Sequence, residues 1–193
     1  MTHMADATVK TIRDLIWFQY AKTMARDSGF PNGQNGIVRK TLEDLRSGIR
    51  EWSVITHDDS LLAGVEKKCA YCGRSSELSR EHLVPSSLAI NEKCPDCDTI
   101  QTIHNQVWAC RMCNSAKGTL GLYQFYHRRM TGKKKLEDAI PPLLEKKYLK
   151  VVYDCLNCAK CLDCGDLDGD GELTVLDIDF AIQQKGRLWN VLL

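Results

Sequence analysis

Two amphipathic repeats predict two helices in the first sixty residues. The first predicts a helix within residues 1–28, and its apolar face contains Val9, Ile12, Leu15, Ile16 and Tyr20. A loop rich in glycine and asparagine follows. The second repeat has apolar steps of four and three residues, at Val38, Leu42, Leu45, Ile49 and Trp52. Because apolar stripes are usually buried, we expect this helical pair to pack on the rest of the protein. The alternative is an arm that binds DNA or a partner.

The middle of the chain predicts two strands. Residues 77–84 predict the first strand, which Pro85 ends because proline cannot continue a strand ladder. Residues 105–109 predict the second strand, with Val107 and Trp108 available for packing. The connection at 86–104 is longer than a tight hairpin needs.

Helical patterns follow the second strand. A helix is predicted from Cys113 onwards, and its apolar face contains Leu122, Phe125 and Tyr126. Residues 136–153 predict a mixed helical stretch that is interrupted at Pro141 and Pro142. Two neighbouring strands flanked by helices predict the α+β class.

Charge is uneven along a nearly neutral chain. The 193 residues have a formal net charge of +1, which alone does not indicate nucleic acid. Acidic residues concentrate between 163 and 179. Basic residues concentrate at Arg128, Arg129, Lys133, Lys134, Lys135, Lys146, Lys147 and Lys150. This basic run could contact phosphates, or it could be a solvated charged face.

The ten cysteines occur mostly in C-x2-C steps, unlike the scattered spacing of a disulfide framework. The N-terminus lacks an apolar signal region, and no stretch is long enough to span a bilayer. We therefore expect a protein without membrane association, in a reducing, cytoplasmic compartment, with thiolates that bind metal.

Two of these steps predict a structural zinc site. Cys69 and Cys72 form one pair, and Cys110 and Cys113 form the other. Four thiolates presented at two turns suit tetrahedral zinc. The segment between the pairs is too short for a core of its own, so the metal would contribute folding free energy.

Inside this zinc-bound segment lie residues suited to phosphodiester hydrolysis. That reaction needs a base for water and a cation on the phosphate oxygens. Glu81, His82 and Asn114 can supply the base and the oxygen ligands. The alternatives are a packed core histidine at 82 and a helix N-cap at Asn114.

Taken in order, C-A-Y-C, S-R-E-H-L-V-P and H-N-Q-V-W-A-C-R-M-C-N-S-A-K-G resemble the HNH nuclease module, a ββα-metal fold. The resemblance spans 69–117. It implies that His82 deprotonates the attacking water and that Glu81 and Asn114 hold one Mg²⁺ or Mn²⁺ ion. Glu81 stands where the family most often has Asp. Asn105 would hold the connecting loop by hydrogen bonds, with His104 as an alternative group near the site.

The same resemblance implies DNA as the partner. Lys117 could contact phosphate or be a surface lysine, and Arg128 and Arg129 begin the basic run. Two other classes of function stay open. One is a zinc module that binds nucleic acid or protein without cutting; the other is a calcium-regulated interaction protein.

The remaining six cysteines predict a second metal site without fixing its ligands. Four thiols in the tail could bind zinc alone, or they could share it with the third C-x2-C step. An iron–sulfur cluster fits the number of ligands, but the last spacing and the missing proline favour zinc. The candidates are Cys94, Cys97, Cys155, Cys158, Cys161 and Cys164.

The acidic tail contains one loop that resembles an EF-hand, in the dockerin-like form with Asp at its twelfth position. Gly171 stands where the loop turns sharply, and Ile178, Ala181 and Ile182 predict an outgoing helix. A turn rich in Asp and Gly that binds nothing tightly is the alternative. The expected calcium ligands are Asp166, Asp168, Asp170, Glu172, Thr174 and Asp177.

Together these patterns predict a small zinc-stabilised ββα-metal module with flanking helices and a Cys-rich, EF-hand-like tail. We expect an N-terminal helical region at 1–60, the nuclease module at 61–132, a helical connector at 133–154 and the tail at 155–193. The expected function is metal-dependent cleavage of DNA.

Overall fold

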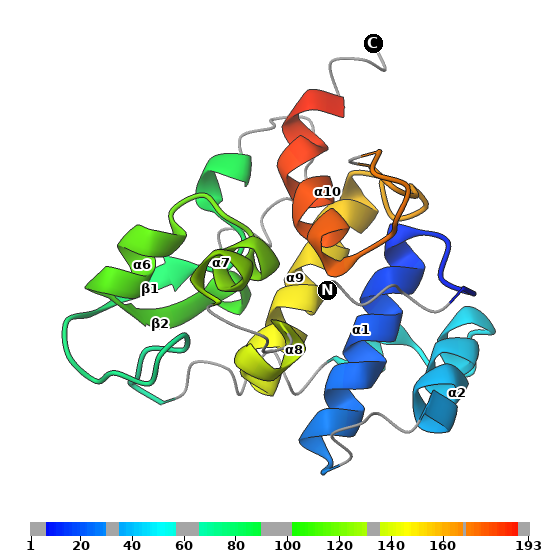
Figure 1. Cartoon of the computed structure of the whole chain (residues 1–193), viewed down its shortest axis with the longest axis horizontal. Coiled ribbons are helices and arrows are strands. Elements are labelled where there is room, and N and C mark those ends of the chain that lie inside the picture. The colour runs from blue at the N-terminus through cyan, green and yellow to red at the C-terminus, as the bar shows by residue number, and fades with distance from the viewer. Residues whose placement is uncertain are drawn as a thin grey trace.

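The structure, a computed structural model, describes residues 7–29, 35–56, 66–89, 102–130, 136–167 and 169–188. These residues form a mostly helical α+β fold with one two-stranded antiparallel hairpin (Figure 1). The elements are α1 (Ile12–Asp27), α2 (Asn35–Arg46), α3 (Trp52–Ile55), β1 (Leu78–His82), η1 (Ser86–Ala89), η3 (Ile103–Asn105), β2 (Gln106–Cys110), α6 (Arg111–Lys117), α7 (Leu122–Arg129), α8 (Leu136–Ala139), α9 (Pro142–Cys158) and α10 (Val175–Leu188).

The N-terminal helical region forms, but its second helix is shorter than predicted. α2 ends at Arg46, and a turn separates it from α3. Gly48 in this turn has φ +73°, a left-handed conformation that glycine adopts without steric cost. The turn changes the register of the apolar repeat, so Ile49, expected on the buried face, is 75 % exposed.

The two predicted strands form an antiparallel hairpin. Its register pairs Arg80 with Trp108 and His82 with Gln106. Because side chains alternate along a strand, Arg80 and His82 share one face while Glu81 lies on the other. The helix α6 follows β2 directly and packs on the Glu81 face, as the ion pair between Glu81 and Lys117 shows.

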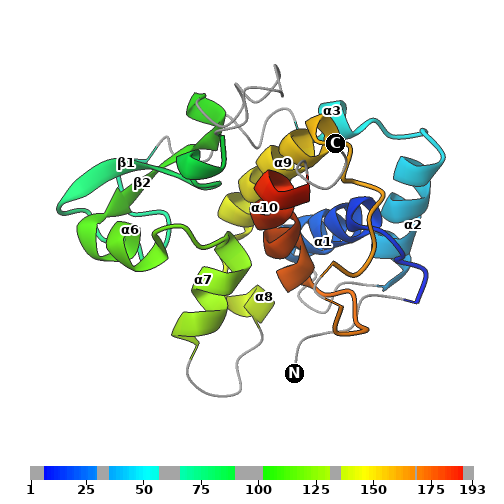
Figure 2. The same cartoon turned by 90° about the horizontal axis from the view of Figure 1, so that it is seen from above.

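The central helix α9 begins at the prolines that were expected to interrupt it. Pro141 is the N-cap and Pro142 the first helical residue, a position where the missing N–H costs nothing. Figures 1 and 2 show α9 between the hairpin with α6 and the helix α1. The same helix buries Glu145, which accepts hydrogen bonds from Gln19, Thr23, Arg26 and Tyr123.

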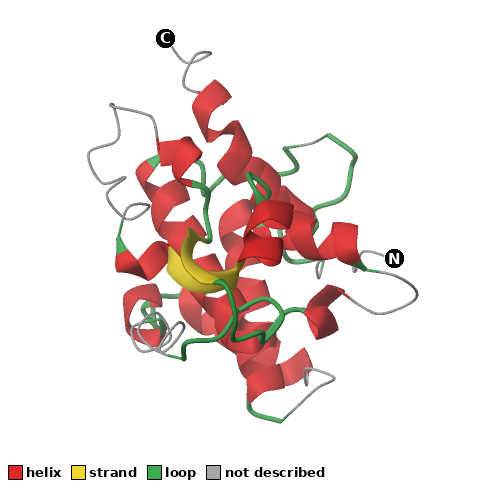
Figure 3. Ribbon diagram, turned by 90° about the vertical axis from the view of Figure 1, so that its left-hand side faces the viewer, coloured by secondary structure: helices red, strands yellow, loops and turns green. Residues whose placement is uncertain are grey.

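One contiguous apolar core joins the N-terminal helices, the hairpin, α9 and the tail. The predicted outgoing helix of the tail is confirmed as α10, and Ile178, Ala181 and Ile182 are fully buried. Figure 3 shows how small the hairpin is beside the helices around it. None of the described helices combines the length and the apolar character needed to span a bilayer.

Candidate functional site

The four cysteines of the two predicted pairs meet at one point. The Sγ atoms of Cys69, Cys72, Cys110 and Cys113 all lie within 4.8 Å of one another, and those of Cys72 and Cys110 are 3.7 Å apart. Four sulfurs at about 2.3 Å from a tetrahedral zinc ion would be about 3.8 Å apart. The predicted four-cysteine cluster is confirmed, and its geometry suits a structural zinc ion.

Local backbone turns place these four thiols close together. Gly73 adopts φ +76° and donates its N–H to the carbonyl of Cys69 at 2.8 Å, which closes the first turn. Ala70 donates to the carbonyl of Trp108 at 2.8 Å and ties this turn to β2. Cys110 ends β2 and is the N-cap of α6, so Cys113 lies in the first helical turn.

Three of the four thiols are buried, and Cys72 is exposed. Burial raises the pKa of Cys113 to about 12, whereas a hydrogen bond from the Cys113 backbone N–H lowers the pKa of Cys110 to about 7. Since zinc binds thiolates, metal binding at this cluster must release protons.

Arg129, expected at DNA, is exposed and lies beside the four-cysteine cluster. Its guanidinium donates to Cys113 Sγ at 3.4 Å and lies 5.0 Å from the ring centroid of Phe125. Arg128 is exposed, as a DNA contact requires.

Glu81, the expected ligand of a catalytic ion, is 7 % exposed and already engaged. Its Oε1 lies 2.9 Å from Lys117 Nζ, and its Oε2 accepts a hydrogen bond from the hydroxyl of Tyr71. Burial raises the pKa of Glu81 above its usual range, while the positive charge of Lys117 opposes that shift. The carboxylate therefore joins β1 to α6 and to the first cysteine turn.

Lys117 is not the surface lysine of the second alternative. Its side chain is 0 % exposed, and its ammonium group also donates to the carbonyl of His82 at 3.1 Å. The sequence contained a signal for this burial: Cys113 and Lys117 are four residues apart on one helix face. Because Cys113 points inward to the zinc cluster, Lys117 must point inward too. In this conformation Lys117 is not available to a phosphate.

His82 ends β1, and its half-buried side chain has an unusual feature. The Nε2 atom is buried and has no hydrogen-bond partner among the described residues. Nδ1 of His104, just before β2, shares this property. Buried polar atoms are nearly always paired, so each of these nitrogens calls for an explanation.

Asn114 lies on the same side of the hairpin as Glu81. Its Nδ2 donates to Ser79 Oγ at 3.3 Å, and Ser79 shares a strand face with Glu81. The helix N-cap alternative for Asn114 is wrong, because Cys110 occupies that position and Asn114 is the fourth helical residue. Asn114 and Lys117 of α6 thus contact the strand face that contains Ser79 and Glu81.

Asn105 is fully buried and fastens the loop after β1. Its Oδ1 accepts from the N–H of Val84, and its Nδ2 donates to the carbonyl of Val84, both at 2.8 Å. Its own carbonyl accepts from the N–H of Leu83 at 2.8 Å. These bonds fix where the chain turns after His82.

The tail cysteines do not gather at a metal site within the described part of the chain. Cys158 is disulfide-bonded, which removes its thiolate from a zinc site in this structure. Cys155, Cys161 and Cys164 form no disulfide. Cys94 and Cys97 lie outside the described residues, so a shared site that includes them stays a prediction.

The acidic loop has the backbone of the expected turn. Gly171 adopts φ +89°, and both carboxylate oxygens of Asp166 accept backbone N–H groups of the loop, from Gly169 and Gly171 at 2.8 Å. Asp168 lies outside the described residues.

The far end of this loop starts α10. Asp177 accepts from the backbone N–H of Thr174 at 2.7 Å, while the hydroxyl of Thr174 accepts from Leu176 at 3.2 Å. Asp177 is 0 % exposed, and its second oxygen has no partner among the described residues. The two residues therefore cap the helix and leave one buried carboxylate oxygen without a hydrogen-bond partner in the described part of the chain. Glu172, by contrast, is exposed.

The basic run is not one surface. Lys146 is 7 % exposed and paired with Asp27 at 2.7 Å, and Lys147 is 2 % exposed. Lys150 pairs with Asp154 at 2.8 Å. The lysines at 133–135 lie outside the described residues. The alternative of a solvated charged face is therefore wrong for Lys146 and Lys147.

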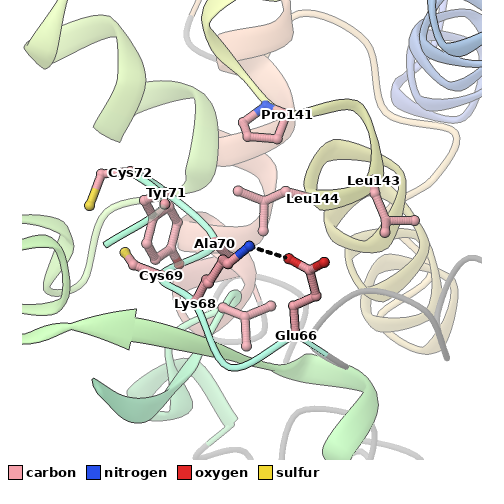
Figure 4. A pocket seen from close by; sticks show the side chains of 11 residues that line it. Glu66, Lys68, Cys69, Ala70, Tyr71, Cys72, Pro141, Leu143 and Leu144 are labelled. Carbon is pink, nitrogen blue, oxygen red and sulfur yellow. Dashed lines mark ion pairs between the residues drawn. The ribbon is translucent and has the colours of Figure 1, made fainter. Parts of the chain in front are cut away.

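A cavity of about 530 Å³ lies between the first cysteine turn and the start of α9 (Figure 4). Its wall is mainly apolar and includes Tyr71, Pro141 and Leu144, and an ion pair between Lys68 and Glu66 at 3.3 Å lies beside it. His82, Glu81 and Asn114 do not line it, so the cavity is separate from the expected catalytic residues.

Comparison of the chain with models of known protein families, with curated proteins and with solved structures found no match.

Proposed function

We propose that the protein is an HNH-type endonuclease that hydrolyses DNA phosphodiester bonds with one divalent ion. The observation that supports this most is the buried Nε2 of His82, which has no partner among the described residues. A histidine with a purely structural role is expected to use both ring nitrogens in hydrogen bonds. A neutral imidazole with a free nitrogen can instead accept the proton of an attacking water.

The surrounding residues have complementary roles in this proposal. Asn105 fixes the loop after His82 through its bonds to Val84. Glu81 and Asn114 would hold the ion, because carboxylate and amide oxygens suit Mg²⁺ or Mn²⁺. When bound, such an ion neutralises charge on the phosphate oxygens. Products with a 5′-phosphate and a 3′-hydroxyl follow by resemblance.

One feature of the site constrains this proposal. Lys117 already places a positive charge 2.9 Å from Glu81, so a divalent ion must displace the ammonium group from that oxygen. The same contact favours a second candidate, a zinc module that binds nucleic acid or protein without cutting. In that case Lys117 would permanently neutralise a structural Glu81. Cleavage assays on His82→Ala distinguish the two, since only the nuclease depends on the imidazole.

We also propose that the acidic loop binds calcium through Asp166, Asp168, Asp170, Thr174, Asp177 and the carbonyl of Glu172. The specific support is Asp177, which is 0 % exposed and keeps one buried oxygen without a partner among the described residues. A carboxylate oxygen at the twelfth loop position is a calcium ligand in loops of this kind. Calcium would stabilise the start of α10 and would not take part in the chemistry.

A further inference from the structure

The outer face of the hairpin, opposite α6, has two cations around one indole ring. The guanidinium carbon of Arg80 lies 4.1 Å from the ring centroid of Trp108, and Lys67 Nζ lies 5.5 Å from it. Arg80 and Lys67 are exposed, and Trp108 is half-buried. Within the described part of the chain, neither cation forms an ion pair with a carboxylate.

This group lies beside the expected catalytic base. Arg80 and His82 are two residues apart on β1, and two residues of a strand span about 6.6 Å. They share one face because side chains alternate, and Arg80 pairs in register with Trp108. The distance is comparable to the spacing of neighbouring phosphates along one DNA strand.

A third cation, Lys147, lies near this group. Lys147 of α9 is buried, and its ammonium donates to the carbonyl of Ile103, just before β2, at 3.4 Å. Burial lowers the pKa of Lys147 to about 8, and the positive charge of Arg80 contributes to that shift.

The arrangement suits an anionic ligand. A guanidinium stacked on an indole is held in place by a cation–π contact, while its N–H edge stays available for a bidentate bond to phosphate. Lys67 adds a second charge on the same ring, and the two like charges repel. A polyanion would relieve that repulsion, and a phosphate chain presents charges at regular intervals.

We propose that Arg80, Lys67 and Trp108 form a DNA-phosphate subsite beside His82, with Arg80 as the positioning residue. This inference rests on the proposed nuclease function. It places phosphate contacts on the His82 face of the hairpin, whereas the side chain of Lys117 is buried on the α6 side. Because the contacts are to the backbone, the subsite favours no DNA sequence.

The test measures DNA binding separately from cleavage. Full-length, zinc-loaded His82→Ala protein is titrated with a fluorescein-labelled DNA duplex over a range of salt concentrations, without added divalent ions. Adding Arg80→Ala should weaken binding roughly tenfold for every duplex sequence and reduce the salt slope by about one. Arg80→Lys should restore the slope but only part of the affinity, because lysine lacks the bidentate, stacking group. The control is Lys68→Ala, an exposed lysine paired with Glu66, which should bind like the parent.

A kinetic measurement separates positioning from a structural role. In protein with His82 intact, Arg80→Ala should raise the KM for plasmid DNA with little change in the melting temperature. An unchanged salt slope in Arg80→Ala would overturn the subsite, as would a lack of DNA binding by the parent. Stronger binding of a poly-glutamate peptide than of DNA would make this face a protein-docking surface and would also overturn it. Cleavage of DNA by His82→Ala protein would contradict the nuclease mechanism. The salt dependence of binding would still test the subsite independently.

Discussion

Lys117 Nζ lies 2.9 Å from Glu81 Oε1, and both side chains are almost completely buried. The pair joins the helix α6 to the strand β1, and Tyr71 completes the bonding of the carboxylate. The acid expected to hold the catalytic ion therefore already has a cation of its own. Metal binding and this internal ion pair must compete for the same oxygen.

Lys117→Met tests that competition. Removing one partner of a buried ion pair typically costs about 3–5 kcal/mol, so the metal-free variant should melt at a lower temperature. Mn²⁺ should then raise the melting temperature of Lys117→Met more than that of the wild type, because it no longer has to displace the ammonium. Thermal unfolding with and without MnCl₂ measures both effects.

The matched control is Lys68→Met, which removes an exposed lysine paired with Glu66. Its response to Mn²⁺ should equal that of the wild type. Equal Mn²⁺ stabilisation of Lys117→Met and wild type would mean that Glu81 does not bind the ion.

Cys69→Ser and Cys110→Ser should each remove one equivalent of zinc per chain and unfold the hairpin region. Both thiols are buried in a four-cysteine cluster, and a structural zinc ion contributes folding free energy directly. Elemental analysis and circular dichroism measure the two losses together. A folded variant that kept its full zinc content would rule out the four-cysteine site.

The sequence identified this cluster because each pair supplies its two ligands from one short turn. Strand positions were predictable for a similar local reason, since alternation and Pro85 define them. The break between α2 and α3 at Gly48 was not predictable, because the apolar repeat in the sequence continues through Gly48 to Trp52. The alternative of a surface position for Lys117 was wrong, although its four-residue spacing from Cys113 would have predicted burial.

Contacts between distant segments left no pattern in the sequence. Asp179 of α10 accepts a hydrogen bond at 2.7 Å from the backbone N–H of Gln124, in the first turn of α7, and another at 2.6 Å from the hydroxyl of Tyr148. Gly121 leaves room for this, because a Cβ there would lie 2.1 Å from Asp179 Cγ. A side chain 55 residues away thus caps a helix whose own N-cap residue has no side chain.

Asp179 should make stability depend on pH. Complete burial raises its pKa to about 7, whereas an unfolded Asp titrates near 3.8. The folded protein keeps this proton over a pH range in which the unfolded chain has lost it. This contribution to stability is therefore complete below about pH 3.8 and is lost as the pH rises through 7.

Asp179→Asn should remove this dependence. Relative to the variant, the unfolding free energy of the wild type should fall by about 1.4 kcal/mol per pH unit between pH 5.5 and 6.5. Urea unfolding of both zinc-loaded proteins measures the difference in unfolding free energy. Proton binding and release by the cysteines is common to both proteins and therefore cancels. Parallel profiles would show that Asp179 is ionised throughout.

Calcium should raise the melting temperature through the loop before α10. Asp166→Ala combined with Asp170→Ala removes two ligands and two negative charges, so the double variant should not respond to calcium. At a concentration of about 100 times its dissociation constant, calcium would add roughly 2.7 kcal/mol to the wild type. If millimolar calcium leaves the melting temperature of the wild type unchanged, the loop is an acidic turn that does not bind calcium. Loss of Mg²⁺-dependent nicking in a folded double variant would mean that the tail belongs to the nuclease site.

The most direct test of the proposed function is plasmid nicking by wild type and His82→Ala, with zinc-loaded proteins and added Mg²⁺ or Mn²⁺. The four-cysteine cluster does not include His82, so the variant should keep its zinc content, its fold and its melting temperature. Loss of a general base typically lowers the rate by about 10²–10⁴-fold, and we expect a loss in that range. Nicking by His82→Ala at the wild-type rate, or no nicking by the folded wild type with either ion, would contradict the assignment as a nuclease.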